Sequence, residues 1–531
     1  MLFSPLLLLA LCPLQPQSEG PAVPDAAVPG RGNAGIDVQH YDLALALFPP
    51  TPRISARATI TLRLKEDSKT VELDFSSSLL VSKVHINGSR AKFLQKKDRL
   101  VLKLPKRTPE GSELSLEIHY AGTLPQRSVT MGEPVGLLTD GIGLVAYPEP
   151  DGARNWFPCN DHPSDKAKVS IDLLLPSGNF GAATGQFTHY SNSPGWTRSR
   201  WESTTQVATY LVSLAAGPFD VIFRPAPIPI IDLALPGDGE RVRKNLAVMT
   251  KQIPAFEIAL GPYPFSRYGH VFTRLMVGGL ECQTMTVLGR MAGLGGNEGL
   301  LAHELGHQWF GDWVSPRQWK DLWLNEGGAT WSEHLWARQS DNPKEAKYLL
   351  QQWRRSVLRL ARSKTARPLS NPPIDNMFGH HLVYNKGGMV LYLLESWMGE
   401  ETFFAALRHY FDTCGDETAD TGKFQTALEE SSGIDLNHFF RMWIHGTQVP
   451  NIEASFKSKR KSKIWSVSLN LTQNKKHWFP FATEVRFRSK DGAEARFPLR
   501  INSAKAVFSF ELPFSPKEMA LDPDALLPIR T

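Results

Sequence analysis

Cysteine is scarce in this chain of 531 residues, which contains only four. One of them, Cys12, falls in an apolar stretch at the N-terminus, and the others are Cys159, Cys282 and Cys414. Three cysteines allow at most one disulfide bond, so the fold cannot depend on covalent staples. It must be stabilised by its core, and the hydrophobic content of 42% suits roughly two to four globular domains.

Long hydrophobic runs are also missing beyond the N-terminus, so no membrane-spanning segment is predicted. Residues 1–20 contain a short apolar core and then turn polar and Pro-rich. We predict that they are a cleaved export signal and that the protein is periplasmic or secreted, although the segment lacks early Lys or Arg. Cys12 lies in a weak match to a lipid-attachment box, so lipid anchoring is the less favoured alternative.

Charge of one sign does not accumulate over the chain as a whole. Lys and Arg total 59 against 53 Asp and Glu, and a net charge of +6 is small for this length. This argues against nucleic acid as a partner. Residues 457–463 and 475–477 are basic clusters, interpreted as a solvated hairpin turn and its neighbour, with an anionic-surface contact as the alternative.

Periodicity divides the chain into three parts and predicts a multidomain α+β protein. In residues 33–225 an antiparallel β domain is expected, because residues 54–64, 70–75 and 114–120 alternate polar and apolar side chains. Asn87-Gly88 indicates a tight turn there. Residues 451–531 again resemble strands, at residues 465–471, 484–488, 495–499 and 505–511, and have the size of a small β-sandwich.

Helical periods dominate residues 226–450, the expected catalytic domain. The expected helices cover residues 240–260, 296–310, 326–338, 343–362, 384–397, 401–414 and 423–432. Pro254 should kink or split the first of them, because proline removes a backbone hydrogen bond.

A metal-ligand spacing begins at His303. His303 and His307 are four residues apart, so a helix places both imidazoles on one face. Glu304 lies about 100° further round, beside the ion, where it can accept a proton from water. Glu326 follows after a further 18 residues and can complete the set from a second helix. Two histidines and one carboxylate leave an open position on zinc, which is typical of a catalytic site.

The alternative is an ordinary helix whose histidines are solvated or paired with carboxylates. The residues before this motif, 297–302, lead in as an apolar helix. A buried His-Glu-His helix needs partners for its polar groups, and a metal ion satisfies them. This favours the metal site.

Five motifs in order resemble those of the gluzincin zinc aminopeptidases, the family that includes aminopeptidase N and leukotriene hydrolase. They are residues 158–163, similar to the family's PCxDxP stretch, residues 278–282 in the place of its GxMEN exopeptidase motif, residues 303–307, residues 325–327 and residues 384–388. The resemblance covers nearly the whole chain after the leader. It implies an N-terminal saddle-like β domain, a thermolysin-like, mainly helical zinc domain and a small β-sandwich.

The resemblance implies a role for each of the matching residues. His303, His307 and Glu326 would bind one zinc ion, and Glu304 would be the general base. Tyr384 would donate a hydrogen bond to the tetrahedral intermediate. The alternative for Tyr384 is a core tyrosine at the start of an apolar helix.

The family also implies how the substrate is held. Glu281 and Glu149 would bind the free α-amine of a peptide, with exposed loop acids as the alternative. Gly278 and Gly279 would let the peptide backbone approach closely, because glycine has no Cβ. Two positions depart from the family pattern: Cys282 replaces asparagine and Leu280 replaces methionine, which leaves the contacts around the scissile bond open.

The function predicted from these residues is a zinc-dependent aminopeptidase acting on peptides with a free N-terminus. A thermolysin-like endopeptidase is one alternative, and Glu281 and Glu149 argue against it. An epoxide hydrolase is another. The chain is expected to lack the helical-repeat domain that supplies carboxylate-binding residues in that branch, which argues against the epoxide reaction. An inactive binding protein is the third alternative, disfavoured by the complete set of catalytic residues.

Overall fold

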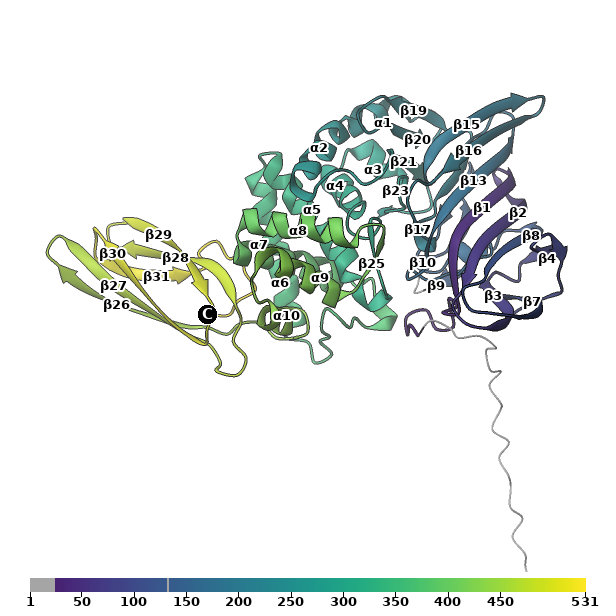
Figure 1. Ribbon diagram of the computed structural model, residues 1–531. Helices are drawn as coiled ribbons and strands as arrows, with labels where there is room; N and C mark the ends of the chain where they lie inside the picture. The colour runs from purple at the N-terminus through teal and green to yellow at the C-terminus, as the bar shows by residue number, and fades with distance from the viewer. Residues whose placement is uncertain (1–23, 131–132) are drawn as a thin grey trace, which may run out of the picture.

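The computed structural model describes residues 24–130 and 133–531. Three parts follow one another in space as in sequence: a β-rich part in purple and blue, a mainly helical part in teal and green, and a β part in yellow (Figure 1). The multidomain α+β prediction is therefore confirmed. The export-signal and Cys12 lipid-anchor predictions concern residues outside the described ranges and stay predictions. No helix within the described ranges is both long and apolar enough to cross a membrane.

A nine-stranded sheet forms the base of the N-terminal part, in the order β15-β16-β13-β1-β2-β8-β4-β5 with β17 beside β13. Its strands are β1 (Ile36–Phe48), β2 (Thr51–Leu64), β4 (Leu79–Ile86), β5 (Ser89–Arg90), β8 (Glu113–Thr123), β13 (Lys166–Pro176), β15 (Gln186–Ser193), β16 (Trp196–Glu202) and β17 (Val207–Ala208). Alternate residues of β2 are buried from Ile54 to Leu64, as the period of two predicted. The expected antiparallel pairing has one exception, since β1 and β13 pair in parallel. Residues 49–165 supply the long crossover that a parallel pair needs.

Smaller sheets complete this part. They are built from β3 (Ser68–Asp74), β6 (Phe93–Lys96), β7 (Arg99–Thr108), β9 (Val129–Thr130), β10 (Glu133–Pro134), β11 (Gly136–Thr139), β12 (Leu144–Tyr147), β14 (Phe180–Ala183) and β18 (Leu214–Gly217). The tight turn at Asn87-Gly88 is confirmed, because it joins β4 to β5 with φ angles of 49° and 78°. β12 ends two residues before Glu149, so this sheet carries one predicted site residue to the helical part.

The middle part begins with a five-stranded sheet in the order β19-β20-β21-β23-β22. These strands are β19 (Asp220–Arg224), β20 (Ile230–Ala234), β21 (Tyr268–Thr273), β22 (Gly279–Leu280) and β23 (Thr286–Gly289). The boundary predicted between residues 225 and 226 falls in the turn of the β19–β20 hairpin, whose two strands both belong to this sheet. β22 is an edge strand that leads directly into Glu281.

Ten α-helices of the described residues follow or flank this sheet. They are α1 (Gly239–Asn245), α2 (Met249–Leu260), α3 (Arg290–Gly295), α4 (Glu298–His307), α5 (Trp323–Gln339), α6 (Pro343–Leu360), α7 (Gly387–Met398), α8 (Glu400–Cys414), α9 (Thr421–Ser432) and α10 (Asn437–Trp443). The first predicted helix is divided at the 3-10 turn Leu246–Val248 rather than at Pro254, and α2 continues across the proline. The helix predicted from residue 384 instead begins as a π-helix, η6 (His380–Lys386), that runs into α7.

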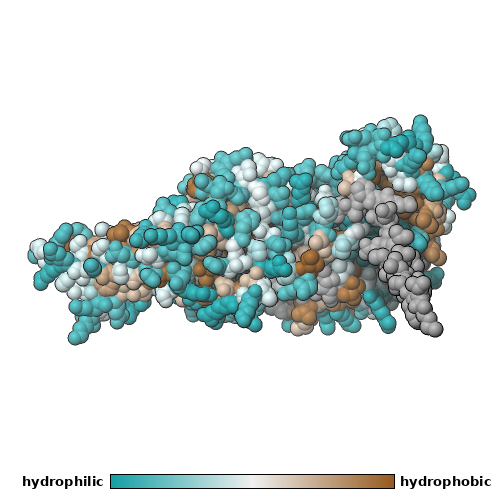
Figure 2. Space-filling view, turned by 90° about the horizontal axis from the view of Figure 1, so that it is seen from below, coloured by the Kyte–Doolittle hydropathy of each residue, from teal (hydrophilic) through white to brown (hydrophobic). Residues whose placement is uncertain are grey.

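Two three-stranded sheets form the C-terminal part: β26 (Glu453–Lys461), β27 (Ile464–Thr472) and β30 (Lys505–Leu512), and β28 (Phe481–Ser489), β29 (Glu494–Ile501) and β31 (Pro516–Leu521). Phe456 and Phe510 of one sheet contact Phe487 of the other, which makes the small sandwich. The basic cluster at residues 457–463 covers the end of β26 and the following turn, whereas residues 475–477 lie beyond the opposite end of β27. Hydrophilic side chains dominate the face seen in Figure 2, with hydrophobic ones in small groups.

Candidate active site

A cavity of about 880 Å³ collects all nine of the site residues expected from the sequence. Glu149 reaches it from the N-terminal part, and Gly278, Gly279 and Glu281 border it along β22. The remaining residues come from α4, α5 and η6: His303, Glu304, His307, Glu326 and Tyr384. The sequence motifs, far apart in the chain, therefore line one space.

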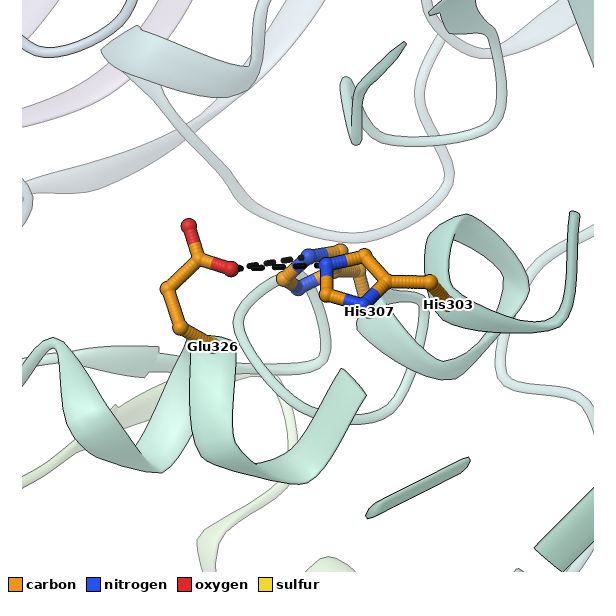
Figure 3. Close-up of side chains that lie close together, drawn as sticks. All are labelled: His303, His307 and Glu326. Atoms are coloured by element: carbon orange, nitrogen blue, oxygen red, sulfur yellow. Dashed lines mark ion pairs between the residues drawn. The ribbon is translucent and has the colours of Figure 1, made fainter. Parts of the chain in front are cut away.

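His303 and His307 lie one turn apart on α4 and face Glu326 of α5 (Figure 3). The Asn297 side chain caps α4 by accepting a hydrogen bond from the Leu300 amide, which fixes where the helix begins. Each imidazole Nε2 is 3.5 Å from Glu326 Oε2. Burial alone would raise the pKa of Glu326, but its contacts with the two histidines lower that pKa to about 2.

These three side chains fit a zinc ion. One possible ligand atom from each lies within 4.8 Å of the other two. Glu326 Oε2 is buried and has no hydrogen-bond partner within the described part of the chain, which is costly unless a cation lies beside it. Two imidazole nitrogens and one carboxylate oxygen are the donor set of a catalytic zinc site with an open position.

Two hydrogen-bond acceptors fix the orientation of the imidazoles, and the sequence analysis missed both. Glu333 Oε1 is 2.8 Å from His303 Nδ1. Asn325 Oδ1 is 2.5 Å from His307 Nδ1. Such contacts leave each Nε2 free to bind a metal ion and hold the ring in place. The sequence could have indicated both residues. Asn325 adjoins the predicted ligand Glu326, and Glu333 lies seven residues after Glu326 on the same helix face.

Glu304 occupies the neighbouring face of α4. It is almost fully buried, and its Oε2 has no partner among the described residues. Burial raises the pKa of Glu304 to about 7, although His303 and His307 oppose that change. A Cβ at Gly279 would lie only 2.0 Å from Glu304 Oε1, so the close approach of β22 to this carboxylate requires glycine. A Cβ at Gly278 would meet nothing within 4 Å, so no such contact explains that glycine.

Tyr384 projects from η6 towards the same carboxylate. Its hydroxyl donates a hydrogen bond of 2.8 Å to Glu326 Oε1, and its ring stacks on His303 with centroids 6.0 Å apart. Burial and the nearby carboxylates raise the pKa of Tyr384 well above its usual value, so the hydroxyl keeps its proton. The alternative of a purely core tyrosine is excluded by its place in the cavity lining.

Glu149 and Glu281 form a second group of carboxylates beside the triad. Their oxygens and one of Glu326 lie within 4.8 Å of each other. Burial, followed by the charge of Glu281, raises the pKa of Glu149 well above its usual value. Asn325 Nδ2 donates to Glu281 Oε1 at 2.8 Å, whereas Glu149 Oε1 has no partner in the described chain. This arrangement favours a bound cation that approaches both carboxylates.

Leu280 and Cys282, the two residues that depart from the family's exopeptidase motif, lie in different surroundings. Leu280 borders the cavity, whereas Cys282 is fully buried and is not part of the lining. The loss of the usual asparagine at position 282 therefore changes the packing behind the cavity, while the contact surface at position 280 remains apolar.

Both halves of the site fall in segments that match one peptidase family. Residues 37–211 match the peptidase M1 N-terminal domain, and residues 261–443 match the peptidase family M1 domain. The leucyl aminopeptidase of Saccharolobus solfataricus is 26% identical over 422 residues, which cover 76% of this chain and 52% of that protein. The alanine/arginine aminopeptidase of Saccharomyces cerevisiae is 25% identical, with coverages of 80% and 53%. The chain thus spans about half the length of these relatives.

The chain also resembles solved structures, and these matches cover nearly the whole length of the other protein. The M1 zinc metallopeptidase of Deinococcus radiodurans is 28% identical, with a TM-score of 0.73, and the match covers 81% of this chain and 98% of that one. A mutant of that enzyme has been solved with a Tyr-Ser-Ala substrate, and it matches with a TM-score of 0.72 at 28% identity, over 81% of this chain and 99% of that one.

Proposed function

The chain belongs to peptidase family M1, and from that premise we propose that it is a zinc-dependent aminopeptidase that removes the first residue of peptides. The observation that carries this proposal is the position of Glu149 and Glu281, whose oxygens lie within 4.8 Å of Glu326. A free α-amine held by these two carboxylates would leave only the first peptide bond at the metal-ligand triad.

His303, His307 and Glu326 would hold the zinc ion. When bound, zinc polarises the peptide carbonyl and lowers the pKa of water, which supplies the nucleophile at neutral pH. The hydrogen bonds that Glu333 and Asn325 accept from the two imidazoles would keep both rings turned towards the ion. The site would thus be held in place before substrate arrives.

Glu304 would move the proton. As the oxygen of water bonds to the carbonyl carbon, the carboxylate accepts the proton of that water. It then gives this proton to the peptide nitrogen as the C–N bond breaks. Support comes from the unpartnered Oε2 that Glu304 presents at the cavity.

Tyr384 would stabilise the charge that develops on the carbonyl oxygen. Its hydroxyl lies at the cavity and donates to Glu326 Oε1, so it would turn from that oxygen to the substrate's carbonyl oxygen. A fixed donor at that position stabilises an oxyanion without reorganisation of solvent.

A thermolysin-like endopeptidase is the main rival. An internal peptide segment brings no ammonium group, so it would leave the buried Glu149 and Glu281 together without a cation. The same pair disfavours an epoxide hydrolase, whose reacting group is uncharged. An inactive binding protein would have no need for the free carboxylate of Glu304.

Kinetics on a panel of aminoacyl fluorogenic substrates test the proposal. The protein should release the fluorophore, lose this activity with a chelator and regain it with zinc. The Glu304→Gln variant should keep its zinc but lose several orders of magnitude in kcat, because only the proton acceptor is removed. Near-normal turnover by Glu304→Gln would show that another group is the base.

A further inference from the structure

We propose that the cavity also selects substrates by charge beyond the cut bond, favouring peptides with Lys or Arg as their second and third residues and rejecting Asp and Glu there. The inference rests on the proposed function and adds a substrate class to it. It follows from how the carboxylates are distributed around the triad.

The cavity has two distinguishable ends. At the His307 end, Asn325 connects the imidazole to Glu281, with hydrogen bonds of 2.5 Å and 2.8 Å. At the His303 end, Glu333 accepts from the other imidazole at 2.8 Å, and His380 lies beside Tyr384 with ring centroids 5.4 Å apart. Asn325 thus links Glu281 to one imidazole, whereas Glu333 contacts the other imidazole, one helical turn away on α4.

Glu345 belongs to the His303 end. It stands in the first turn of α6, and only three residues separate α6 from α5, the helix that carries Glu333. Trp336, in the C-terminal half of α5, donates a hydrogen bond to Glu298 in the first turn of α4. The C-terminal half of α5 therefore lies beside the start of α4. Glu345 borders the cavity, and its carboxylate has no hydrogen bond or ion pair with any described residue.

A peptide whose amine is held at the Glu281 end must leave the triad in the other direction. Its second and third residues would then pass Glu333 and Glu345. The lining includes six glutamates and three histidines, and the described residues that form it include no Lys or Arg. Two glutamates face the amine, one binds the ion and one moves the proton, which leaves Glu333 and Glu345 to meet the substrate's later residues.

Cationic side chains would be attracted to this end, and anionic ones would be repelled. The Glu333 side chain is 25% exposed and is screened less than a charge on an open surface, whereas the charge of the exposed Glu345 is screened more strongly by salt. Burial lowers the pKa of the neighbouring His380, which disfavours a positive charge there.

Three peptides of equal length test the inference: Ala-Lys-Lys-Ala-Ala, Ala-Gln-Gln-Ala-Ala and Ala-Glu-Glu-Ala-Ala, with release of the first alanine followed by chromatography. The kcat/KM of the wild-type enzyme should be at least about tenfold higher for the Lys peptide than for the Glu peptide at low salt. The ratio should shrink between about 0.01 M and about 1 M salt, as the Debye length falls from about 30 Å to about 3 Å.

Two variants of the exposed Glu345 assign the effect to this end. Glu345→Gln should reduce the Lys-to-Glu ratio about threefold, and Glu345→Lys should bring it near one. Glu401→Gln is the matched control, because Glu401 is also an exposed carboxylate in the first turn of a helix but lies outside the cavity lining. It should leave the ratio as in the wild type.

Failure of this inference is distinct from failure of the proposed function. Equal kcat/KM for the three peptides, or a ratio unchanged in Glu345→Lys, would overturn the charge selection while leaving an aminopeptidase. No release of alanine from the Gln peptide by the zinc-loaded enzyme would overturn the proposed function itself.

Discussion

At the scale of single residues, Asn325 connects the two chemical halves of the site. Its Oδ1 is 2.5 Å from His307 Nδ1, and its Nδ2 donates to Glu281 Oε1 at 2.8 Å. The side chain lies against Gly311, where a Cβ would approach Asn325 Oδ1 to 2.0 Å. One amide thus orients His307, a proposed metal ligand, and Glu281, one of the two carboxylates proposed to bind the amine.

The Asn325→Leu substitution should therefore weaken both functions. Loss of the acceptor for His307 is expected to lower zinc affinity by about 10- to 100-fold, measured by chelator competition. Loss of the donor to Glu281 should also raise KM for free-amine substrates at saturating zinc. Asn245→Leu removes a comparable hydrogen bond, to the Gly293 carbonyl, and should change neither quantity. Unaltered zinc affinity in Asn325→Leu would remove this residue from the site.

Residue spacing was sufficient to predict which side chains come together as possible metal ligands, but not the residues that hydrogen-bond to them. The i, i+4 pair His303 and His307 and the adjacent Glu304 follow from helix geometry alone. Glu149, by contrast, was assigned through family resemblance, because its approach depends on how the N-terminal sheet meets the helical part. Asn325 and Glu333 were missed since a hydrogen bond to an imidazole leaves no repeat in the sequence.

At the scale of helices, α5 and α7 meet through glycines that belong to two of the sequence motifs. A Cβ on Gly327 would lie 2.8 Å from the Cα of Gly387, and a Cβ on Gly387 would lie 2.7 Å from the Cα of Gly327. Gly327 follows the ligand Glu326, and Gly387 follows the π-helix that carries Tyr384. The absence of side chains at this crossing lets Tyr384 and Glu326 come within hydrogen-bond distance.

Gly387→Ala should push the helices apart and separate Tyr384 from Glu326. The expected results are a loss of about 1–3 kcal/mol in the free energy of unfolding and a fall in kcat of about tenfold to hundredfold. Denaturant unfolding and steady-state kinetics measure these effects. Gly295→Ala is the control, since a Cβ there meets nothing within 4 Å. Wild-type values for both measurements in Gly387→Ala would contradict the close-contact explanation.

His334 of α5 makes the stability of this helix pair depend on pH. Its ring lies between Trp353 and Tyr392, with centroids 5.8 Å and 5.4 Å away. Burial, with a smaller effect of Arg338, lowers the pKa of His334 to about 3. The unfolded chain, with a histidine pKa of about 6.5, binds the proton first, so stability is lost as pH falls through that value.

His334→Phe should remove this dependence. Relative to the wild type, the variant should gain about 2 kcal/mol in free energy of unfolding between about pH 7 and about pH 5. Denaturant titrations at both pH values measure the change, and groups that titrate in both proteins cancel in the difference. A difference independent of pH would mean that His334 does not keep a low pKa in the folded protein.

The boundaries of helices and strands were predicted well where a long pattern of polar and apolar side chains marked the element. They were predicted poorly where the local backbone geometry determined where the element begins. The pattern in β2 and in α6 matches the structure closely. A split at Pro254 was wrong, because the helix divides earlier, at Leu246–Val248, and α2 continues across the proline in its middle. The π-helix before α7 was also missed, since apolar spacing does not distinguish it from an α-helix.

At the scale of the whole molecule, the active site depends on the meeting of two parts of the chain. The triad, Glu304 and Tyr384 belong to the helical part, whereas Glu149 follows a strand of the N-terminal part. The helical part alone would contain the zinc site of a general metallopeptidase. Addition of the N-terminal part supplies the second carboxylate that would restrict the enzyme to free N-termini.

One measurement tests that claim most directly: mass spectrometry of the products formed from one peptide in two forms, with a free and with an acetylated N-terminus. Acetylation removes the positive charge and adds bulk where Glu149 and Glu281 converge. The account predicts stepwise loss of N-terminal residues from the free peptide and almost no cleavage of the acetylated one. Efficient internal cuts in the acetylated peptide would contradict it.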